Sequence, residues 1–440
     1  MNEPTVLKTT QDPDPALVQY PCGPKVVIVG GGFAGIAAAK ALKGSDADVT
    51  LIDRRNHHIF QPLLYQVATA VLAPSDVAAP IRQLAAKQPN VSVVLGEVVG
   101  VDLESRTILA DCPGVGAKRL GFDYLVIAAG MQSSYFGHNE FAEHASCLKT
   151  ITDAESIRSK ILGAYELAES TEDPSERQRQ MTFVLVGAGP TGVELAASIA
   201  QMKSTTLRSN FRRIDPAKSS IILLEGGPRV LPSFAEPLSQ KVADRLRRLG
   251  VQVLTGAMVE HIDAQGVTVG GKRIESGTVL WTAGVAPSPL VKMIGGPTDR
   301  AGRAAVGPFM NVPDKEGIFV VGDTASVMQN GRPLPGVAQV AIQQGRYVGR
   351  LIASEVRGVK RSRPFHYFDK GNMAVVGKNF AIMESGRIRL AGTIAWFIWA
   401  FIHLWFLPQL QNRRRVQNQW LWSYLTGQRG SRLVYEAPRT

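Results

Sequence analysis

Two stretches of the chain share one pattern of apolar and small residues. Lys25–Leu42 reads KVVIVGGGFAGIAAAKAL, and Thr182–Ile199 reads TFVLVGAGPTGVELAASI. In each, an apolar, β-branched run is followed by a glycine turn and then by small residues. The run predicts a strand buried on both faces, and the small residues allow the next helix to lie close to the sheet. The repeat therefore predicts an α/β protein with two Rossmann-type dinucleotide-binding domains.

The first glycine turn contains Gly30, Gly32 and Gly35. Glycines at this spacing permit a tight turn, a close approach of the backbone to a pyrophosphate, and close packing of helix and strand. The start of the helix then offers free N–H groups and a positive dipole end to the phosphates. The next apolar run, DVTLID, ends in Asp53, which is placed to bind ribose hydroxyls.

The second turn contains Gly187, Gly189 and Gly192. Its acidic residue closes the run SIILLE and is Glu225, after a polar insertion that lengthens the usual spacing. A carboxylate there repels a 2′-phosphate and accepts hydrogen bonds from a free ribose diol, which favours NADH over NADPH. Arg229 lies nearby and weakens this inference slightly.

Two further apolar runs are consistent with a bound flavin. FDYLVIAAG ends in Gly130, and GIFVVGDTA ends in a Gly-Asp pair that contains Asp323. An acid after a buried strand lies at the carboxyl edge of the sheet, where ligands bind. Asp323 is also a candidate helix N-cap, and the two roles are compatible.

Length, cysteines and charge narrow the class. A chain of 440 residues predicts two or three domains. The three cysteines, Cys22, Cys112 and Cys147, are scattered, which argues against a disulfide framework or a zinc ribbon. The net charge of +12 arises in residues 341–440, where sixteen Lys and Arg accompany four Asp and Glu. A basic C-terminal segment indicates an anionic partner.

The densest motifs resemble those of type II NADH dehydrogenases, the single-subunit NADH:quinone oxidoreductases that do not pump protons. They are HHIFQPLLYQVATAVLAPSDVAAPIR, YFG, GAGPTGVELA, WTAGV, GVAQVAIQQG and DKGNMAVVG. The resemblance implies tightly bound FAD in the first Rossmann domain and NADH in the second, with Gly284 of WTAGV among the cofactor-binding residues. It further implies a quinone motif at Ala338, Gln339 and Gln343, with Lys370 near the quinone channel.

The resemblance implies hydride transfer from nicotinamide to flavin N5, followed by transfer of two electrons to a membrane quinone. Glu194 is expected near the nicotinamide–flavin contact, although a first-turn Glu also stabilises its helix dipole. Gln339 and Gln343 share one helix face and can donate to a quinone carbonyl, or else bind backbone. Lys370 can stabilise negative charge on a reduced quinone oxygen, or else be a solvated turn residue. No metal site is expected.

The segment Ala391–Leu407, AGTIAWFIWAFIHLWFL, is apolar but short for a membrane span. Five of the six tryptophans follow Ala391, and three consecutive arginines follow Leu407. Tryptophan favours membrane interfaces, and arginine suits anionic headgroups. We therefore expect a helix in the membrane surface, with packing on the protein's own core or on a dimer partner as the alternative.

These features predict five segments of the chain and the cellular location of the protein. The expected segments are a flexible arm (1–23), the two parts of the FAD-binding domain (24–145 and 297–345), the NADH-binding domain (146–296), and a C-terminal region with quinone-site and membrane-anchoring helices (346–440). We expect a homodimer that does not bind nucleic acid, peripheral on the cytoplasmic face of a bacterial inner membrane. The alternatives are a soluble NADH oxidase or ferredoxin reductase, and a redox-sensing flavoprotein.

Overall fold

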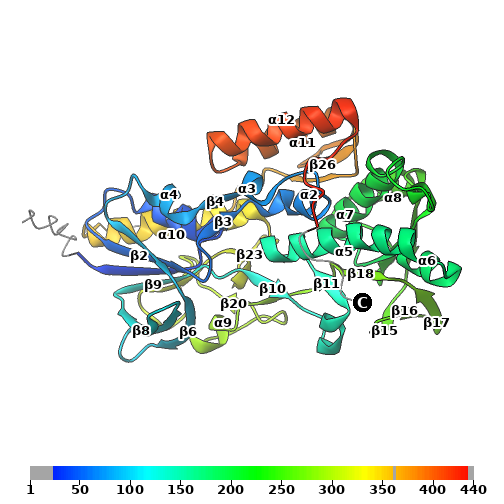
Figure 1. The fold of residues 1–440 in the computed structure, drawn as a ribbon. Coiled ribbons are helices and arrows are strands. Elements are labelled where there is room, and N and C mark those ends of the chain that lie inside the picture. The colour runs from blue at the N-terminus through cyan, green and yellow to red at the C-terminus, as the bar shows by residue number, and fades with distance from the viewer. Residues whose placement is uncertain (1–22, 360–362, 435–440) are drawn as a thin grey trace, which may run out of the picture.

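A computed structural model describes residues 23–359 and 363–434. The expected N-terminal arm, apart from residue 23, lies outside the described residues, as does Cys22. Two lobes lie side by side, each built around a parallel sheet, and two C-terminal helices extend across the top of the molecule (Figure 1).

The first lobe contains a five-stranded parallel sheet. Its strands, in spatial order, are β21 (Ile318–Val320), β9 (Tyr124–Ile127), β1 (Lys25–Val29), β2 (Asp48–Asp53) and β5 (Val91–Leu95). Helices α1 (Phe33–Ala41) and α10 (Ala338–Val356) pack together beside it. Their approach requires glycine, because a Cβ placed on Gly345 would lie 2.0 Å from the carbonyl oxygen of Ala34.

The second lobe repeats this architecture. Its parallel strands, in spatial order, are β11 (Ala145–Cys147), β18 (Thr278–Trp281), β12 (Thr182–Val186), β13 (Ser220–Glu225) and β14 (Val251–Thr255). Its main helices are α5 (Ile151–Ser170), α7 (Pro190–Gln201) and α8 (Glu236–Arg248). The polar insertion before β13 forms a π-helical turn, Met202–Thr206, and a short 3-10 turn, Pro216–Lys218. The two sheets confirm the predicted pair of Rossmann-type domains.

The structure also contains smaller sheets and short helices outside the two parallel sheets. Three of the antiparallel sheets have three strands each: β6 (Glu97–Asp102), β7 (Thr107–Cys112) and β8 (Gly116–Gly121); β15 (Val259–Asp263), β16 (Gly266–Val269) and β17 (Lys272–Glu275); and β25 (Asn372–Val375), β26 (Ala381–Ser385) and β27 (Ile388–Gly392). Short helices are α2 (Leu64–Ala68), α3 (Pro74–Val77), α4 (Ile81–Ala85), α6 (Pro174–Gln180) and α9 (Leu290–Met293).

The C-terminal region forms two helices, α11 (Thr393–Phe406) and α12 (Leu410–Thr426). The residues before Thr393 belong to β27, so α11 begins slightly later than the expected apolar segment. One side of this pair is part of the protein core, where Trp399, Leu407 and Val416 are buried. Within the described residues, no helix is both long and apolar enough to cross a membrane.

Candidate active site

The two glycine turns have the same backbone geometry. Gly30 and Gly187 have φ angles of +109° and +99°, a conformation that residues with a Cβ rarely adopt. The third glycine of each turn packs against the first: a Cβ on Gly35 or Gly192 would lie 1.8 or 1.9 Å from the carbonyl oxygen of Gly30 or Gly187. This contact brings each helix close to its strand.

The middle glycines, Gly32 and Gly189, have open space beside them. A Cβ added to either glycine would meet no protein atom within 4 Å. Each is the N-cap of its helix, α1 or α7, so the first N–H groups of that helix lie next to this space. The arrangement provides a place where a pyrophosphate can approach the backbone closely.

Each strand-ending acid holds its own glycine turn. Asp53 accepts hydrogen bonds from the N–H groups of Gly31 and Arg55, at 2.6 and 2.7 Å. Glu225 accepts them from Ala188 and Gly227, at 2.7 and 2.8 Å. The sequence predicted ribose contacts for both acids, and these stay predictions. The structure shows that each carboxylate holds its own glycine turn.

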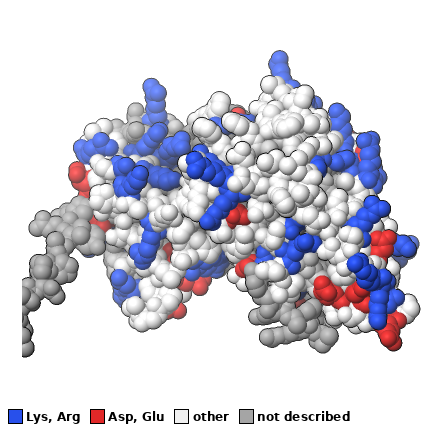
Figure 2. Space-filling view, turned by 45° about the horizontal axis from the view of Figure 1, so that its top comes forward, with Lys and Arg blue, Asp and Glu red and all other residues white. Residues whose placement is uncertain are grey.

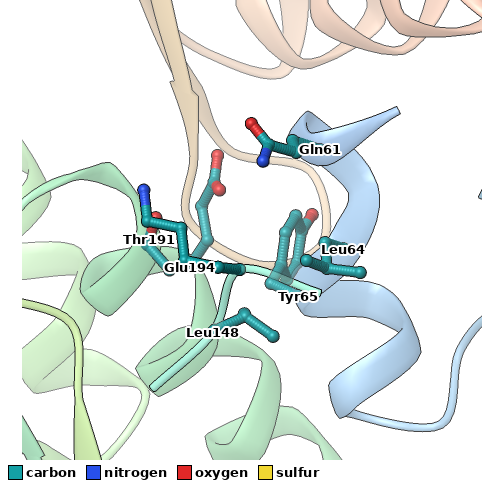
Figure 3. A pocket seen from close by; sticks show the side chains of 7 residues that line it. Gln61, Leu64, Tyr65, Leu148, Thr191 and Glu194 are labelled. Atoms are coloured by element: carbon teal, nitrogen blue, oxygen red, sulfur yellow. The ribbon is translucent and has the colours of Figure 1, made fainter. Parts of the chain in front are cut away.

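A pocket lies where the two lobes meet, between α2, which packs against α5 and α7, and the start of α7 (Figure 3). It has an empty volume of about 360 Å³, which includes open solvent. The lining side chains come from the segment 61–65, from the segment before α5 and from α7: Gln61, Leu64, Tyr65, Leu148, Lys149, Thr191 and Glu194. Helix α7 begins at the second glycine turn, so this turn is next to the pocket.

Glu194 and Tyr65 lie on opposite walls of this pocket (Figure 3). Burial raises the pKa of the Glu194 carboxyl to about 8, and a backbone hydrogen bond from Val375 acts in the opposite direction. Burial, and then the nearby Glu194, raise the pKa of Tyr65 well above its ordinary value. Both groups are therefore mostly protonated near neutral pH and can act as hydrogen-bond donors.

Asp323 lies in the 3-10 turn Gly322–Thr324 that follows β21. Burial raises its pKa, and the positive charges of Lys149 and Arg303 oppose this shift. Lys149 also lines the pocket, and burial lowers its own pKa while Asp323 opposes the shift. Lys149 therefore links the pocket electrostatically to the carboxyl edge of the first sheet. Gly130, at the end of the neighbouring strand β9, also has open space beside it.

The glutamine pair on α10 divides into two different environments. Gln339 has a buried Oε1 atom with no hydrogen-bond partner among the described residues. Gln343 has both ends of its amide occupied, because Nε2 donates to the Phe368 carbonyl at 2.9 Å and Oε1 accepts from the Phe368 N–H at 3.0 Å. Ala338 is the first residue of the helix. The structure thus leaves Gln339 Oε1 without a partner among the described residues and uses Gln343 to hold the segment before Lys370.

Lys370 and Gly284 complete the set predicted from the sequence. Lys370 is exposed, and its Nζ lies 6.0 Å from the centre of the Phe406 ring on α11. Lys370 is therefore next to the C-terminal helices, and it is not among the residues lining the pocket between the lobes. Gly284 packs against protein: a Cβ there would lie 2.6 Å from the Phe136 ring and 2.7 Å from the Ser134 carbonyl.

Sequence reasoning gave no role to three pocket residues, Tyr65, Lys149 and Thr191. The signal for Tyr65 was present, because it lies in the quoted motif FQPLLYQ. Thr191 lies in the quoted motif GAGPTGVELA. Lys149 carries no such signal, since only the packing of α5 and α7 against α2 brings it to the pocket.

Residues 24–345 match the family model described as pyridine nucleotide-disulphide oxidoreductase. The chain is 42% identical over 423 residues to the type II NADH:quinone oxidoreductase Ndh of Mycobacterium tuberculosis, and the match covers 94% of this chain and 90% of that protein. The chain belongs to the type II NADH:quinone oxidoreductases. This assignment confirms the family resemblance of the motifs and the two-domain flavoprotein architecture.

More distant members of the type II NADH:quinone oxidoreductases agree along most of their length. The internal alternative NAD(P)H-ubiquinone oxidoreductase A1 of Arabidopsis thaliana mitochondria is 28% identical over 93% of this chain and 86% of its own. The structure of NDH2 from Plasmodium falciparum in complex with NADH is similar in fold, with a TM-score of 0.86 and 21% identity over 93% of this chain and 99% of that one.

Proposed function

We propose that this flavin-dependent NADH:quinone oxidoreductase binds FAD on its first Rossmann domain and NADH on its second, and that the two rings meet in the pocket lined by Tyr65 and Glu194. The observation that carries the proposal is the position of this pocket. It lies beside the second glycine turn, and one of its lining residues, Lys149, interacts electrostatically with Asp323 at the carboxyl edge of the first sheet.

The residues of the first lobe suit FAD. The open space beside Gly32 and the start of α1 accommodate a pyrophosphate, and Asp53 holds the loop that forms this space. The unpartnered Oε1 atom of Gln339 requires a donor, which a flavin ring or a quinol hydroxyl provides. Bound flavin would supply a two-electron acceptor between NADH and quinone, and the protein's task is to orient the rings and exclude water.

Glu194 suits a contact with nicotinamide. A carboxyl group with a pKa of about 8 is mostly neutral at pH 7 and therefore has an O–H to donate. The carboxamide oxygen of nicotinamide is a suitable acceptor, and a neutral acid avoids placing a second negative charge next to a reduced flavin. Glu194 thus positions NADH by donating a hydrogen bond to it.

Glu225 supports the choice of NADH over NADPH. Its carboxylate lies at the end of β13, where the adenosine ribose of a Rossmann-bound dinucleotide is placed. Arg229, the residue that weakened this inference in the sequence, donates to the carbonyl of Pro232 at 3.1 Å. Its guanidinium is therefore partly engaged elsewhere, which favours discrimination against a 2′-phosphate.

We place the quinone route on the side of α10 and α11. Gln343 holds Phe368 by a pair of hydrogen bonds, two residues before Lys370, and Lys370 lies by Phe406 at the end of α11. A quinone that leaves the lipid near this end of α11 meets Lys370 before it reaches the α10 glutamines. The ammonium group then stabilises charge that develops on the quinone oxygen during reduction.

The exposed side of the C-terminal helices suits a membrane surface. Large apolar side chains project from it on α11 and on the end of α12: Ile394, Phe397, Phe401, Trp405, Leu421, Trp422 and Leu425. We call these seven residues the apolar face. Figure 2 turns the top of the molecule forward and shows Lys and Arg side chains around a broad uncharged area. Apolar insertion combined with basic flanks favours a peripheral enzyme on an anionic lipid surface.

The same pattern supports the cytoplasmic face of a bacterial inner membrane, where NADH is available. The homodimer and the absence of nucleic-acid binding stay predictions, as do the exact domain boundaries. The apolar face can serve either lipid or a second copy of the chain, and vesicle flotation followed by mass measurement in detergent separates these two uses.

The flavin spectrum tests the proposal directly. Purified protein should show flavin absorbance that NADH bleaches and a short-chain quinone restores. Asp53→Ala and Asp323→Ala should each lower FAD occupancy in a chain that remains folded, because one loosens the glycine turn and the other removes the acid at the flavin edge. Fully occupied flavin in both variants would show that FAD is anchored by other residues.

A further inference from the structure

The end of α12 and the residues that follow it pack back onto the molecule beside α2 and α7. Residues 420–431, which we call the C-terminal clasp, bond to α2 and to Thr69 directly after it, and to α7 and the π-helical turn of the second lobe. Trp420 Nε1 donates to Gln66 Oε1 at 2.7 Å, and Thr206 Oγ1 donates to the carbonyl of Gly427 at 2.9 Å. The clasp thus connects elements that are far apart in the sequence.

Arg429 is the centre of the clasp. Its side chain is buried, with 6% of the residue exposed. One arm of the guanidinium donates to the carbonyl of Thr69 at 2.6 Å, and the other donates to the carbonyl of Ser198 at 2.8 Å. Among the described residues, no carboxylate lies within ion-pair distance of it. Burying a cation is costly, so this bridge between two helices offsets a substantial desolvation penalty.

The two carbonyls occupy equivalent places relative to the pocket. Thr69 lies four residues after Tyr65, and Ser198 lies four residues after Glu194. Four residues are about one helical turn, so both carbonyls lie one turn behind the two pocket residues on the same helix faces. The hydroxyls of Thr69 and Ser198 also contact each other at 2.8 Å. The guanidinium fork therefore sets the spacing of the two helices whose preceding turns carry Tyr65 and Glu194.

Tyr65 is held from the same segment by a second route. Gln66 Nε2 donates to the Tyr65 hydroxyl at 2.9 Å, and the Oε1 atom of the same amide accepts from Trp420. Trp420 in turn stacks on Trp399 of α11, with ring centres 5.4 Å apart. The indole of Trp420 therefore fixes the orientation of the Gln66 amide. This orientation directs the Nε2 hydrogen of Gln66 toward the Tyr65 hydroxyl.

We infer that Arg429 and Trp420 are positioning residues for the reaction: the C-terminal clasp fixes the separation of Tyr65 and Glu194 across the pocket. This inference rests on the proposed function, which places the reacting rings in that pocket. Its consequence is that the C-terminal region contributes to the rate of flavin reduction even when no membrane is present. A lysine cannot reproduce the fork, because one ammonium group does not reach two carbonyls with the same planar geometry.

The test uses the full chain, loaded with FAD, in detergent micelles with a short-chain quinone. Four variants are compared with the parent: Arg429→Met, Arg429→Lys, Trp420→Phe, and Arg432→Met as the matched control. Arg432 directly follows the clasp and carries the same charge, without a hydrogen bond or ion pair among the described residues. Stopped-flow absorbance gives the limiting rate of flavin reduction and the NADH concentration that half-saturates it.

We expect Arg429→Met to slow the limiting reduction rate roughly 3- to 30-fold. The loss arises because Tyr65 and Glu194 shift relative to the reacting rings, and small errors in position reduce the rate steeply. Arg429→Lys and Trp420→Phe should each give a smaller loss, of roughly 2- to 5-fold. The half-saturating NADH concentration should change little, since the glycine turn and Glu225 are untouched. Arg432→Met should match the parent.

Two readouts do not depend on turnover. Visible circular dichroism of the flavin should change in Arg429→Met, and amide hydrogen exchange in residues 64–70 and 194–201 should accelerate. If Arg429→Met does not fold, the two milder variants decide, and parental reduction rates with parental dichroism in both would overturn the inference. Slowing that occurs only with vesicles and long-chain quinone would also overturn it, in favour of anchoring alone. A parent protein without NADH-bleachable flavin would instead contradict the proposed function.

Discussion

At the scale of single residues, burial makes a carboxyl group useful in its neutral form. Glu194 lies beside the second glycine turn, where a pKa of about 8 keeps its proton in place at neutral pH. The acids at the two strand ends have a different task, because each accepts two backbone N–H bonds from its own glycine turn and strand end. Carboxyl groups thus serve two tasks here. Glu194 can donate a hydrogen bond in the pocket, whereas Asp53 and Glu225 hold the glycine turns.

Glu194 should therefore give flavin reduction a pH dependence. Above pH 8 the side chain loses its proton and can no longer donate, so the reduction rate by NADH should fall in the parent. Glu194→Gln keeps a donor at all pH values, and its profile should be flat across this range. Stopped-flow rates between pH 6 and 9.5 provide the comparison, and parallel profiles would exclude Glu194 as the titrating group.

The raised pKa of Glu194 also makes the stability of the fold depend on pH. The folded-state pKa of Glu194 is raised above the ordinary carboxyl value of 4.5, so its contribution is fully present below about pH 4.5 and is lost as pH rises through about 8. The melting temperature of the parent should therefore fall relative to Glu194→Gln over this window. A constant difference between the two proteins would contradict the raised pKa.

Glu225 should determine the choice of donor. Desolvating a carboxylate beside a 2′-phosphate is unfavourable, so the parent should prefer NADH to NADPH by roughly 10- to 1,000-fold in kcat/KM, which corresponds to a few kcal/mol. Glu225→Gln should narrow this preference and still accept the Ala188 N–H through its amide oxygen. Equal kcat/KM for both donors in the parent would overturn the assignment.

At the scale of elements, α10 lies between the site proposed for the flavin and the route proposed for the quinone. Its first turn lies by the 3-10 turn that contains Asp323, and Gln343 one turn later holds the backbone of Phe368. The glutamine pair shares one helix face as the sequence predicts, but Gln343 binds backbone. That was the alternative reading of these side chains, and it makes Gln343 a support for the segment that carries Lys370.

Gln343→Leu should slow reoxidation of the flavin by quinone and leave reduction by NADH near the parental rate. The substitution removes two hydrogen bonds to Phe368 and loosens the segment before Lys370, so we expect a few-fold to about tenfold loss in kcat/KM for quinone. Lys370→Met should affect the same half-reaction, and Arg346→Ala, an exposed change on the same helix, should affect neither. Slower reduction by NADH in Gln343→Leu would place this helix on the nicotinamide side instead.

At the scale of the whole molecule, the C-terminal helices have two sides with different tasks. The inner side buries Trp399, Leu407 and Val416 in the same core as α2, and the outer side is the apolar face. Deleting the chain from Ala391 onward would therefore remove core residues and the clasp together with the anchor. Substitutions confined to the outer side separate these tasks.

Replacing Phe397, Phe401 and Trp405 together by Ser should release the enzyme from membranes without loss of fold. These side chains are 62%, 65% and 60% exposed, so they contribute little to the core. Each buried aromatic side chain contributes about 2 kcal/mol to insertion, so the triple change should lower vesicle binding more than 100-fold. Raising salt alone should release little of the parent, because salt screens the arginines but not apolar contacts. A variant that still floats with vesicles would require another anchor.

The sequence by itself determined the two Rossmann units, the glycine turns and the acids that end β2 and β13. These features are local: strand, turn and helix follow one another within about 30 residues, and their geometry depends on residue type at fixed spacing. Only the tertiary structure decided that Gln343 binds Phe368, that Trp399 is buried, and that Arg429 bridges α2 and α7. Each of these contacts joins residues that are not neighbours in the local pattern, and for Arg429 the partners are 360 and 231 positions away. Their energies depend on which helix faces meet after the lobes pack, and hydrophobic periodicity does not encode that choice.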